Sequence, residues 1–163
     1  MIVFLDTNIL GLIAKPDKSF DESSDESYQA QQWFYKLLSR GIRVVTSTLC
    51  DYELRRGLLS DSIRSQKIPL GLQELDTLAE NGMLEFLPVS REDGILAADL
   101  WAKASTIGQT SRGNKDIDVD VIISAQCLIL KNDNPGQRVI VATKNIKHLS
   151  RFCEAANWQD IKL

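Results

Sequence analysis

The chain has 163 residues, 44% of them hydrophobic and 25% charged, a balance typical of one globular domain with a continuous core. Its formal net charge of -3 argues against a protein that holds nucleic acid by its overall charge, so any polyanionic partner needs local basic patches. We therefore predict a single domain over residues 1–163.

Four short runs rich in β-branched residues are predicted as strands, at residues 2–5, 42–46, 84–89 and 138–142. The segments with helical spacing of apolar residues are 27–39, 48–59, 90–107 and 119–130. Alternation of strands with helices favours a parallel sheet, so the predicted fold class is α/β.

The chain begins with MIVFLDTN, which has no basic region and too few apolar residues before Asp6 to form a signal peptide. No later segment is long and apolar enough to span a membrane. A cytoplasmic protein is the expectation from these two absences.

The first predicted strand is followed directly by Asp6, Thr7 and Asn8. In parallel α/β sheets, ligands bind beyond the carboxyl ends of the strands, so Asp6 is a candidate ligand-binding residue. The alternative is structural, because these residue types are common at helix starts and Thr7 or Asn8 could cap the next helix.

Two polar segments are predicted as loops. Residues 17–26 are acidic, and Ser23 or Ser24 could cap the helix that follows. Residues 108–115, GQTSRGNK, carry two glycines and two cations directly before an acidic cluster. That composition favours a flexible rim beside a functional site.

Glu53 lies at the edge of the apolar face of the predicted helix 48–59. A carboxylate in that position needs a partner. An ion pair with Arg55 or Arg56 on the same helix is the structural alternative to a functional role.

Asp116, Asp118 and Asp120 alternate directly before the most apolar helical segment. Capping and the helix dipole explain one of these acids but not three. Two carboxylates about 4 Å apart repel by roughly 4 kcal/mol at an effective dielectric constant of about 20, so clustering favours a shared cation.

The last predicted strand is also followed by polar residues, Thr143, Lys144 and Asn145. Thr143 and Asn145 could bind a metal, hold a water or cap the short helix that follows. His148 is the only histidine, and we interpret it as a packed or capping residue because one histidine cannot supply a zinc triad.

The three cysteines are far apart in the sequence, and none belongs to a C-x-x-C motif. The positions of Cys50, Cys127 and Cys153 therefore predict neither a disulfide framework nor a zinc site. We interpret all three as small apolar residues. Trp33, Trp101 and Trp158 fall in apolar patterns and are interpreted as core or interface residues rather than as platforms for bases.

Four motifs in this order, DTN after the first strand, YEL on a mid-chain helix, DVDVIISAQ and VATKN, give the chain a family likeness. The set resembles the PIN-domain nucleases, and among them the VapC-type toxins of bacterial toxin–antitoxin pairs. The likeness extends over essentially the whole chain. It implies a three-layer α/β/α domain with a central, mainly parallel sheet and an acidic pocket that binds Mg²⁺ or Mn²⁺.

The resemblance also implies roles for individual residues. Asp6, Glu53 and Asp120 match the three principal acids of the pattern, and Asp118 lies where some relatives carry a further acid. A fourth acidic position of many members falls near Asn145, a departure that bears on the number of bound metals.

The residues themselves point to the same chemistry. A set of oxygen ligands without cysteine or histidine clusters selects Mg²⁺ or Mn²⁺ over zinc, and either ion can activate water for phosphodiester hydrolysis. We predict Asp6, Glu53, Asp120 and Asp118 as metal ligands and catalytic residues. The residues predicted to orient water or the carboxylates are Thr7, Asn8, Thr143 and Asn145.

An acidic protein that cuts RNA needs local cations near its acids. The candidates are Arg112 and Lys115 in the glycine-bearing segment, Arg56 beside Glu53, and Lys144 after the last strand. The alternative for each is a solvated surface charge. We predict Arg112 as the main phosphate contact.

The resulting prediction is a metal-dependent endoribonuclease whose substrate is RNA. Resemblance to VapC-type toxins further implies a homodimer and a VapB-like antitoxin that lies in a groove near the acids. A haloacid-dehalogenase-like phosphatase needs a second acid where Asn8 stands, and a receiver domain leaves Glu53 unexplained. A noncatalytic PIN-like module that binds RNA or protein remains open, since Asn145 and His148 stand in place of an acid.

Overall fold

The computed structural model describes residues 1–16, 26–106 and 116–162, with the backbone alone for residues 116–118. It contains a five-stranded sheet in the order β3-β2-β1-β4-β5, and every pairing is parallel. The strands are β1 (Ile2–Leu5), β2 (Arg43–Ser47), β3 (Glu85–Leu87), β4 (Val139–Ala142) and β5 (Ala155–Ala156). The predicted α/β class with a parallel sheet is confirmed.

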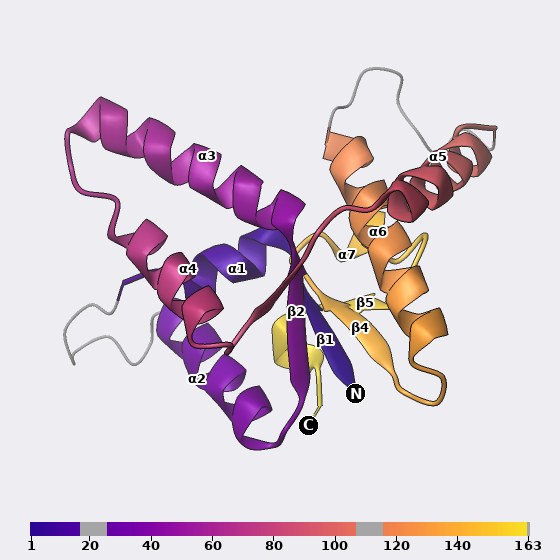
Figure 1. Ribbon diagram of the computed structural model, residues 1–163, viewed down its shortest axis with the longest axis horizontal. Coiled ribbons are helices and arrows are strands. Elements are labelled where there is room, and N and C mark those ends of the chain that lie inside the picture. The colour runs from indigo at the N-terminus through magenta and orange to yellow at the C-terminus, as the bar shows by residue number, and fades with distance from the viewer. Residues whose placement is uncertain (17–25, 107–115, 163) are drawn as a thin grey trace.

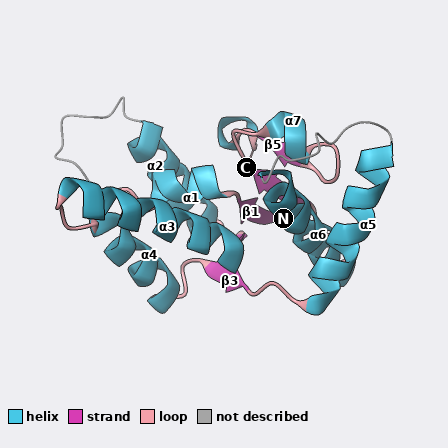
Figure 2. Ribbon diagram, turned by 90° about the horizontal axis from the view of Figure 1, so that it is seen from above, coloured by secondary structure: helices cyan, strands magenta, loops and turns pink. Residues whose placement is uncertain are grey.

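Helices cover both faces of this sheet. In chain order they are α1 (Thr7–Ile13), α2 (Glu26–Ser39), α3 (Thr48–Ser65), α4 (Leu70–Glu80), α5 (Arg91–Thr106), α6 (Asp116–Asp133) and α7 (Ile146–Leu149). Figure 2 shows α1 to α4 gathered on one side of the strands and α5 and α6 on the other. The three-layer α/β/α arrangement that the family resemblance implied is therefore present.

The core explains why these segments take these conformations. All four residues of β1, IVFL, are buried, as expected for a central parallel strand covered on both faces. The main apolar cluster joins the sheet to α1, α2, α4 and α6. A smaller cluster of Ala97, Val121 and Ala125 attaches α5 to α6, and Figure 1 shows α5 at the upper right, beside the upper part of that helix.

Several predicted boundaries were wrong. The helix predicted to end at residue 59 continues to Ser65, because the polar residues that follow Leu59 lie on its exposed side. It stops at Gln66, whose φ of 56° is left-handed. The strand predicted over 84–89 is only Glu85–Leu87, and the helix predicted to begin at residue 119 begins at Asp116.

The sequence did not predict α4 or β5. The two residues of β5 are too few to show alternation, and they form a strand because β4 lies beside them. The predicted acidic loop at residues 17–26, with Ser23 and Ser24, falls outside the described residues except for Glu26, which begins α2. Among the helices that the structure describes, none has the length and apolar character needed to cross a lipid bilayer.

The strand order reverses direction at one point in the sheet, between β1 and β4. The chain adds β2 and β3 on one side of β1 and then β4 and β5 on the other. The carboxyl ends of β1 and β4 therefore form the point where the topology reverses, which is where open α/β sheets bind their ligands.

Candidate active site

Asp6 and Thr143 meet at this reversal point. Leu5 pairs with Ala142 in the sheet, so the residues that follow them leave adjacent strands side by side. The backbone N–H of Asp6 donates to the Ala142 carbonyl over 3.1 Å, and the hydroxyl of Thr143 donates to Oδ2 of Asp6 over 2.6 Å. Both side chains are buried, which makes this a fixed polar contact rather than a surface one.

Asp6 also forms the N-cap of α1. Its Oδ1 accepts from the backbone N–H of Thr7 over 2.7 Å, and its Oδ2 accepts from Nδ2 of Asn8 over 2.6 Å. The suggestion that Thr7 or Asn8 caps this helix is wrong, since the preceding residue takes that position. The amide of Asn8 instead connects two strand ends, because its Oδ1 accepts from the backbone N–H of Lys144 over 3.0 Å.

The ionised form of Asp6 is destabilised by its burial. Burial raises the pKa of the Asp6 carboxyl above its usual value, and hydrogen bonds from Thr143, the Thr7 backbone and Asn8 only partly offset that effect. Every side-chain partner of Asp6 within the described residues is a neutral group. A nearby cation would stabilise the ionised form.

Glu53 joins the same region through Thr7, whose hydroxyl donates to Oε2 of Glu53 over 2.8 Å. The ion-pair alternative for Glu53 is wrong. Arg55 instead contacts Asp51 at 2.8 Å and Asp76 at 2.6 Å, and the guanidinium carbon of Arg56 lies 5.6 Å from the centre of the Tyr52 ring. Among the described residues, Glu53 therefore contacts the start of α1 rather than a cation of its own helix.

Asp120 is buried near the amino end of α6 and faces the residues that follow β4. Nδ2 of Asn145 donates to Oδ2 of Asp120 over 3.1 Å, and the backbone N–H of Asn145 donates to the Thr143 hydroxyl over 2.8 Å. Nδ1 of His148 lies 3.5 Å from the same Asp120 oxygen. His148 is half-buried, and its contact with a predicted site acid is one that its interpretation as a packed or capping residue did not include.

These contacts form one continuous polar network. It runs from Glu53 through Thr7, Asp6, Thr143 and Asn145 to Asp120. Three of the predicted acids and all four predicted supporting residues therefore belong to one region. The one signal that could have placed His148 there is its position one helical turn after Asn145.

The acids are linked by hydroxyl and amide groups rather than by direct contact. Within the described residues, no three Asp, Glu, His or Cys side chains are arranged closely enough to hold an ion. The side chain of Asp118, the further predicted ligand, lies outside the described residues, as does that of Asp116.

The donor set itself fits a hard divalent ion. Each carboxylate oxygen can accept about two hydrogen bonds. Oδ1 of Asp6 accepts one, and among the described residues Oε1 of Glu53 accepts none. Oxygen atoms with free lone pairs are the ligands that Mg²⁺ and Mn²⁺ prefer. The chemistry of Asp6, Glu53 and Asp120 therefore suits such an ion, while their positions within the described residues do not form a group that would hold it.

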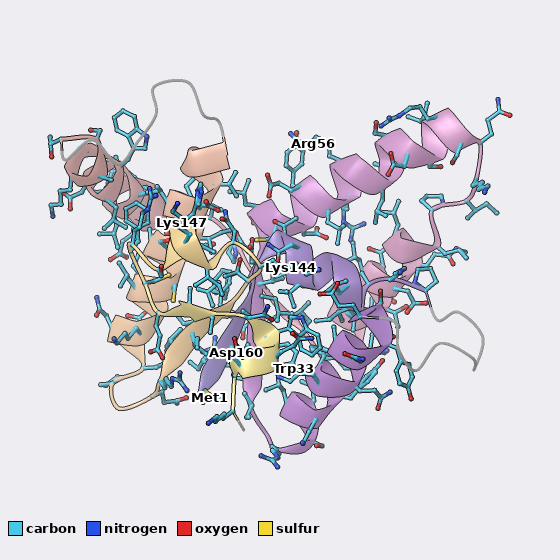
Figure 3. All side chains as sticks on the ribbon, turned by 180° about the vertical axis from the view of Figure 1, so that it is seen from behind. Met1, Trp33, Arg56, Lys144, Lys147 and Asp160 are labelled. Atoms are coloured by element: carbon cyan, nitrogen blue, oxygen red, sulfur yellow. The ribbon has the colours of Figure 1, made fainter. Side chains whose placement is uncertain are left out.

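The predicted RNA-contacting cations differ in availability. Arg56 is exposed, and its one side-chain contact within the described residues is with Tyr52, whereas Lys144 forms a 2.6 Å ion pair with Glu26 at the start of α2. Figure 3 shows Arg56, Lys144 and Lys147 in the half of the molecule that holds the carboxyl ends of the strands, far from Met1. Arg112 and Lys115 lie outside the described residues.

The tryptophans fall into two groups. Trp33 and Trp158 are buried, with ring centres 5.6 Å apart, so their interpretation as core residues is confirmed. Trp101 is 40% exposed and lines an apolar pocket between α5 and α6 with Ala97, Ala98 and Ile122, which leaves it as a surface residue available to a partner.

No protein-family model matches the chain, and no curated protein matches its sequence. Solved structures do match it. One is VapBC2 from Rickettsia felis bound to a promoter DNA fragment, with a TM-score of 0.64, 21% identity and coverage of 97% of this chain and 99% of the other. Another is FitAcB from Neisseria gonorrhoeae, with a TM-score of 0.65, 16% identity and coverage of 98% and 99%.

A third match is VapBC-1 from nontypeable Haemophilus influenzae, with a TM-score of 0.61, 17% identity and coverage of 98% of this chain and all of the other. In each comparison, the similarity extends over nearly the full length of both chains. At such identities they establish a shared fold. The PIN-like fold implied by the sequence motifs is thereby confirmed.

Proposed function

We propose that this chain is a metal-dependent endoribonuclease of the VapC type that hydrolyses RNA phosphodiester bonds with Mg²⁺ or Mn²⁺. The observation that carries the proposal is the polar network at the reversal point of the sheet. It brings Asp6, Glu53 and Asp120 from three separate elements into one region with neutral donors between them. The fold shared with chains of VapBC and FitAB complexes supports this assignment.

The chain supplies ligands and fixes their orientation. Asp6 is the central ligand, because three hydrogen bonds hold its carboxylate while Oδ1 keeps a free lone pair. Thr7 and Asn145 orient Glu53 and Asp120 from either side. When bound, Mg²⁺ or Mn²⁺ would lower the pKa of a coordinated water and neutralise charge on the phosphate.

RNA needs cations around this acidic centre. Arg56 is the best described candidate, because it is exposed and lies on the same helix as Glu53. Its guanidinium lies against the exposed ring of Tyr52, and the two together offer a charged group and a flat surface for an unpaired base. Lys144 can bind a phosphate of the RNA only if its ion pair with Glu26 breaks. Arg112 and Lys115 are proposed as RNA contacts from the sequence alone.

The partners follow from the apolar surface and the fold. Tyr52, Leu59 and Ile63 are exposed on one face of α3. Exposed apolar surface of this kind is typical of a protein-interaction site. We infer a homodimer and a VapB-like antitoxin as partners, and the VapBC complexes that share this fold support the antitoxin. Sedimentation of the wild type and of Ile63→Asp, with and without a co-expressed antitoxin, tests both.

RNA cleavage with defined metals tests the enzyme. Purified protein is incubated with single-stranded and structured RNA in Mn²⁺, Mg²⁺ or EDTA, beside Asp6→Asn and the matched variant Glu85→Gln. Glu85 pairs with Arg43 at the other end of the sheet, so its loss should leave cleavage unchanged. The proposal predicts that the wild type and Glu85→Gln cleave RNA with added metal and that neither does so in EDTA. It also predicts that Asp6→Asn does not cleave RNA under any of these conditions.

One observation favours a second candidate, a noncatalytic RNA- or protein-binding module. Asn145 presents an amide to Asp120 where many PIN nucleases carry a fourth acid. Metal-independent RNA binding without cleavage by any sample would establish this alternative and end the nuclease proposal. Asn145→Asp separates the two further, since an increase in Mn²⁺-dependent RNA cleavage is expected only of an enzyme.

A further inference from the structure

The segment that follows β4 is basic in an otherwise acidic chain. Residues 143–153, TKNIKHLSRFC, carry three cations and no acid, although the net charge of the whole chain is -3. Lys144, Lys147 and Arg151 are all exposed, and we call the surface that bears them the α7 basic surface. Neighbouring like charges repel one another, so this cluster favours a bound anion.

The α7 basic surface adjoins the candidate active site. Asn145 lies between Lys144 and Lys147 in the sequence, and its amide donates to Asp120 over 3.1 Å. His148 directly follows Lys147, and its ring lies 3.5 Å from the same carboxylate oxygen. Figure 3 shows both lysines in the half of the molecule that holds the carboxyl ends of the strands. An anion bound here would therefore lie beside the acidic network.

The two lysines of this surface differ in their contacts. The backbone N–H of Lys144 donates to Oδ1 of Asn8 over 3.0 Å, and its Nζ forms a 2.6 Å ion pair with Glu26. Among the described residues, no carboxylate forms an ion pair with Lys147. Lys147 is therefore available to an external anion, whereas Lys144 becomes available only when its ion pair breaks.

Local stabilisation does not account for these cations. Lys147 lies in the last turn of α7, where a cation interacts favourably with the helix dipole, but a helix of four residues has only a small dipole. The side chains of Lys144 and Glu26 are 42% and 44% exposed, so solvent screening keeps their ion pair weak. A phosphate group beside Lys144 could therefore displace the Glu26 carboxylate with little loss of stability.

We propose that the α7 basic surface binds the phosphate backbone of RNA and leads the strand to the candidate active site, with Glu26 competing for Lys144. The choice of RNA as the polyanion rests on the proposed function, because the surface adjoins the acids proposed to cut it. Each phosphate that a lysine binds releases condensed counterions, so binding weakens as the salt concentration rises. Lys147 supplies one phosphate contact, and Lys144 supplies a second when a phosphate replaces Glu26.

RNA binding without cleavage tests the surface. The anisotropy of a labelled single-stranded RNA is measured in EDTA at several KCl concentrations. Lys147→Ala should weaken binding at low salt by about 3- to 10-fold and reduce the slope of log K against log[KCl] by roughly 0.7, which corresponds to one phosphate contact. Lys131→Ala is the matched control, because it removes an exposed cation from the last turn of α6, at the opposite end of that helix from Asp120. It should bind RNA like the wild type.

Glu26→Gln should have the opposite effect. It releases Lys144, so RNA should bind about 3-fold more tightly and with a steeper salt dependence, a gain that disruption of the fold would not produce. Glu85→Gln is the matched control, since its ion pair with Arg43 is similarly exposed, at 40% and 47%, but lies at the amino end of the sheet. Its RNA affinity should match that of the wild type. Adding Lys144→Ala to Glu26→Gln should abolish the gain, because both changes act on one contact.

Chemical labelling of lysines gives a readout that needs no variant. An amine-reactive reagent modifies exposed lysine side chains, and mass spectrometry of the digested protein measures the modified fraction of each. Single-stranded RNA should protect Lys147 and leave Lys131 as reactive as before. Equal reactivity of Lys147 with and without saturating RNA would overturn the proposal.

The binding measurements can also overturn it. Equal RNA affinities of the wild type, Lys147→Ala and Glu26→Gln would do so, as would equal gains from Glu26→Gln and Glu85→Gln or no RNA binding by the wild type at low salt. If Lys147→Ala keeps its RNA affinity but loses a co-expressed antitoxin, the surface binds protein instead. None of these readouts requires cleavage, so a chain that binds RNA through this surface without cutting it would end the proposed function and leave this proposal intact.

Discussion

The carboxylates at the two ends of the central sheet differ in the charge of the groups that contact them. At the amino end, Arg43 of β2 holds Glu85 of β3 with two hydrogen bonds of 2.9 Å, and Arg138 contacts Glu154 at 2.6 Å. At the carboxyl end, Asp6 receives its hydrogen bonds from hydroxyl, amide and backbone groups only. These amino-end acids pair with arginines of the chain, whereas the donors to Asp6 within the described residues are all neutral.

This difference indicates where an external cation is stabilised. The amino-end pairs are exposed, so their charges are screened and each pair contributes little to stability. Asp6 is buried, and burial raises the pKa of its carboxyl because ionisation there is unfavourable. On the proposed function, a divalent ion would stabilise the carboxyl-end site far more than the amino end.

The largest expected effect is the loss of RNA cleavage when a carboxyl-end acid is neutralised, compared with the same change at the amino end. Asp120→Asn and Glu53→Gln should each reduce RNA cleavage on the order of 100-fold or more, because each removes a metal ligand. The matched amino-end change, Glu154→Gln, should leave cleavage within about twofold, since its partner is an exposed arginine. Single-turnover cleavage at saturating Mn²⁺ measures all three, and equal losses at both ends would break the comparison.

A buried hydroxyl gives the next largest effect. Thr143→Val removes the donor to Asp6 and the acceptor of the Asn145 N–H, and should cost about 1–2 kcal/mol of unfolding free energy. It should also weaken Mn²⁺ binding roughly 10-fold, because a residue that orients a ligand is lost. Urea unfolding and calorimetry measure the two quantities.

Thr46→Val is the control for that change. Thr46 is equally buried at the carboxyl end of β2, but its hydroxyl donates to the Leu5 carbonyl over 2.8 Å rather than to an acid. It should lose comparable stability and keep Mn²⁺ binding. If both variants bind Mn²⁺ equally, the Thr143 hydroxyl has no role beyond packing.

A smaller effect is a pH dependence with a defined sign. The folded-state pKa of Asp6 is raised above its usual value of 3.8, so the folded state holds this proton more tightly than the unfolded chain. In EDTA, this group's contribution to stability should therefore decline as the pH rises from the unfolded pKa through the raised folded pKa. Mn²⁺ should oppose the decline, because it favours the ionised carboxyl.

The unfolding free energy of the wild type minus that of Asp6→Asn, measured against pH with and without Mn²⁺, isolates this contribution. Subtraction removes the titration of other groups that both proteins share. A difference that is flat with pH in EDTA, or one that rises, would show that burial does not control the Asp6 carboxyl.

The smallest effect belongs to the amino end. Arg43→Ala removes an ion pair whose side chains are 40% and 47% exposed, so solvent screening should limit the loss to below about 1 kcal/mol. Mn²⁺ binding should not change. A loss comparable to that of Thr143→Val, measured by urea unfolding, would mean that the amino-end pairs are not merely local contacts.

Part of this architecture could be read from short windows of sequence. The run IVFL followed at once by Asp6 predicts a buried strand that delivers a polar residue to its carboxyl end. The strand–helix alternation predicts a parallel sheet, and the acids at residues 53 and 120 were predicted together with their supporting hydroxyl and amide residues. These features follow from burial periodicity and from residue types that favour strand or helix ends, which are properties of neighbouring residues.

Which side chain meets which was decided only by the tertiary structure. Thr143 reaches Asp6 across 137 residues because β4 lies against β1. Thr7 reaches Glu53 across 46 residues because β2, which leads into α3, lies on the other side of β1. Asn145 and His148 meet Asp120 because α6 packs beside β4 and α7. Sequence spacing determines how a segment folds locally, but contacts between distant segments depend on strand order and helix packing, which no short window contains.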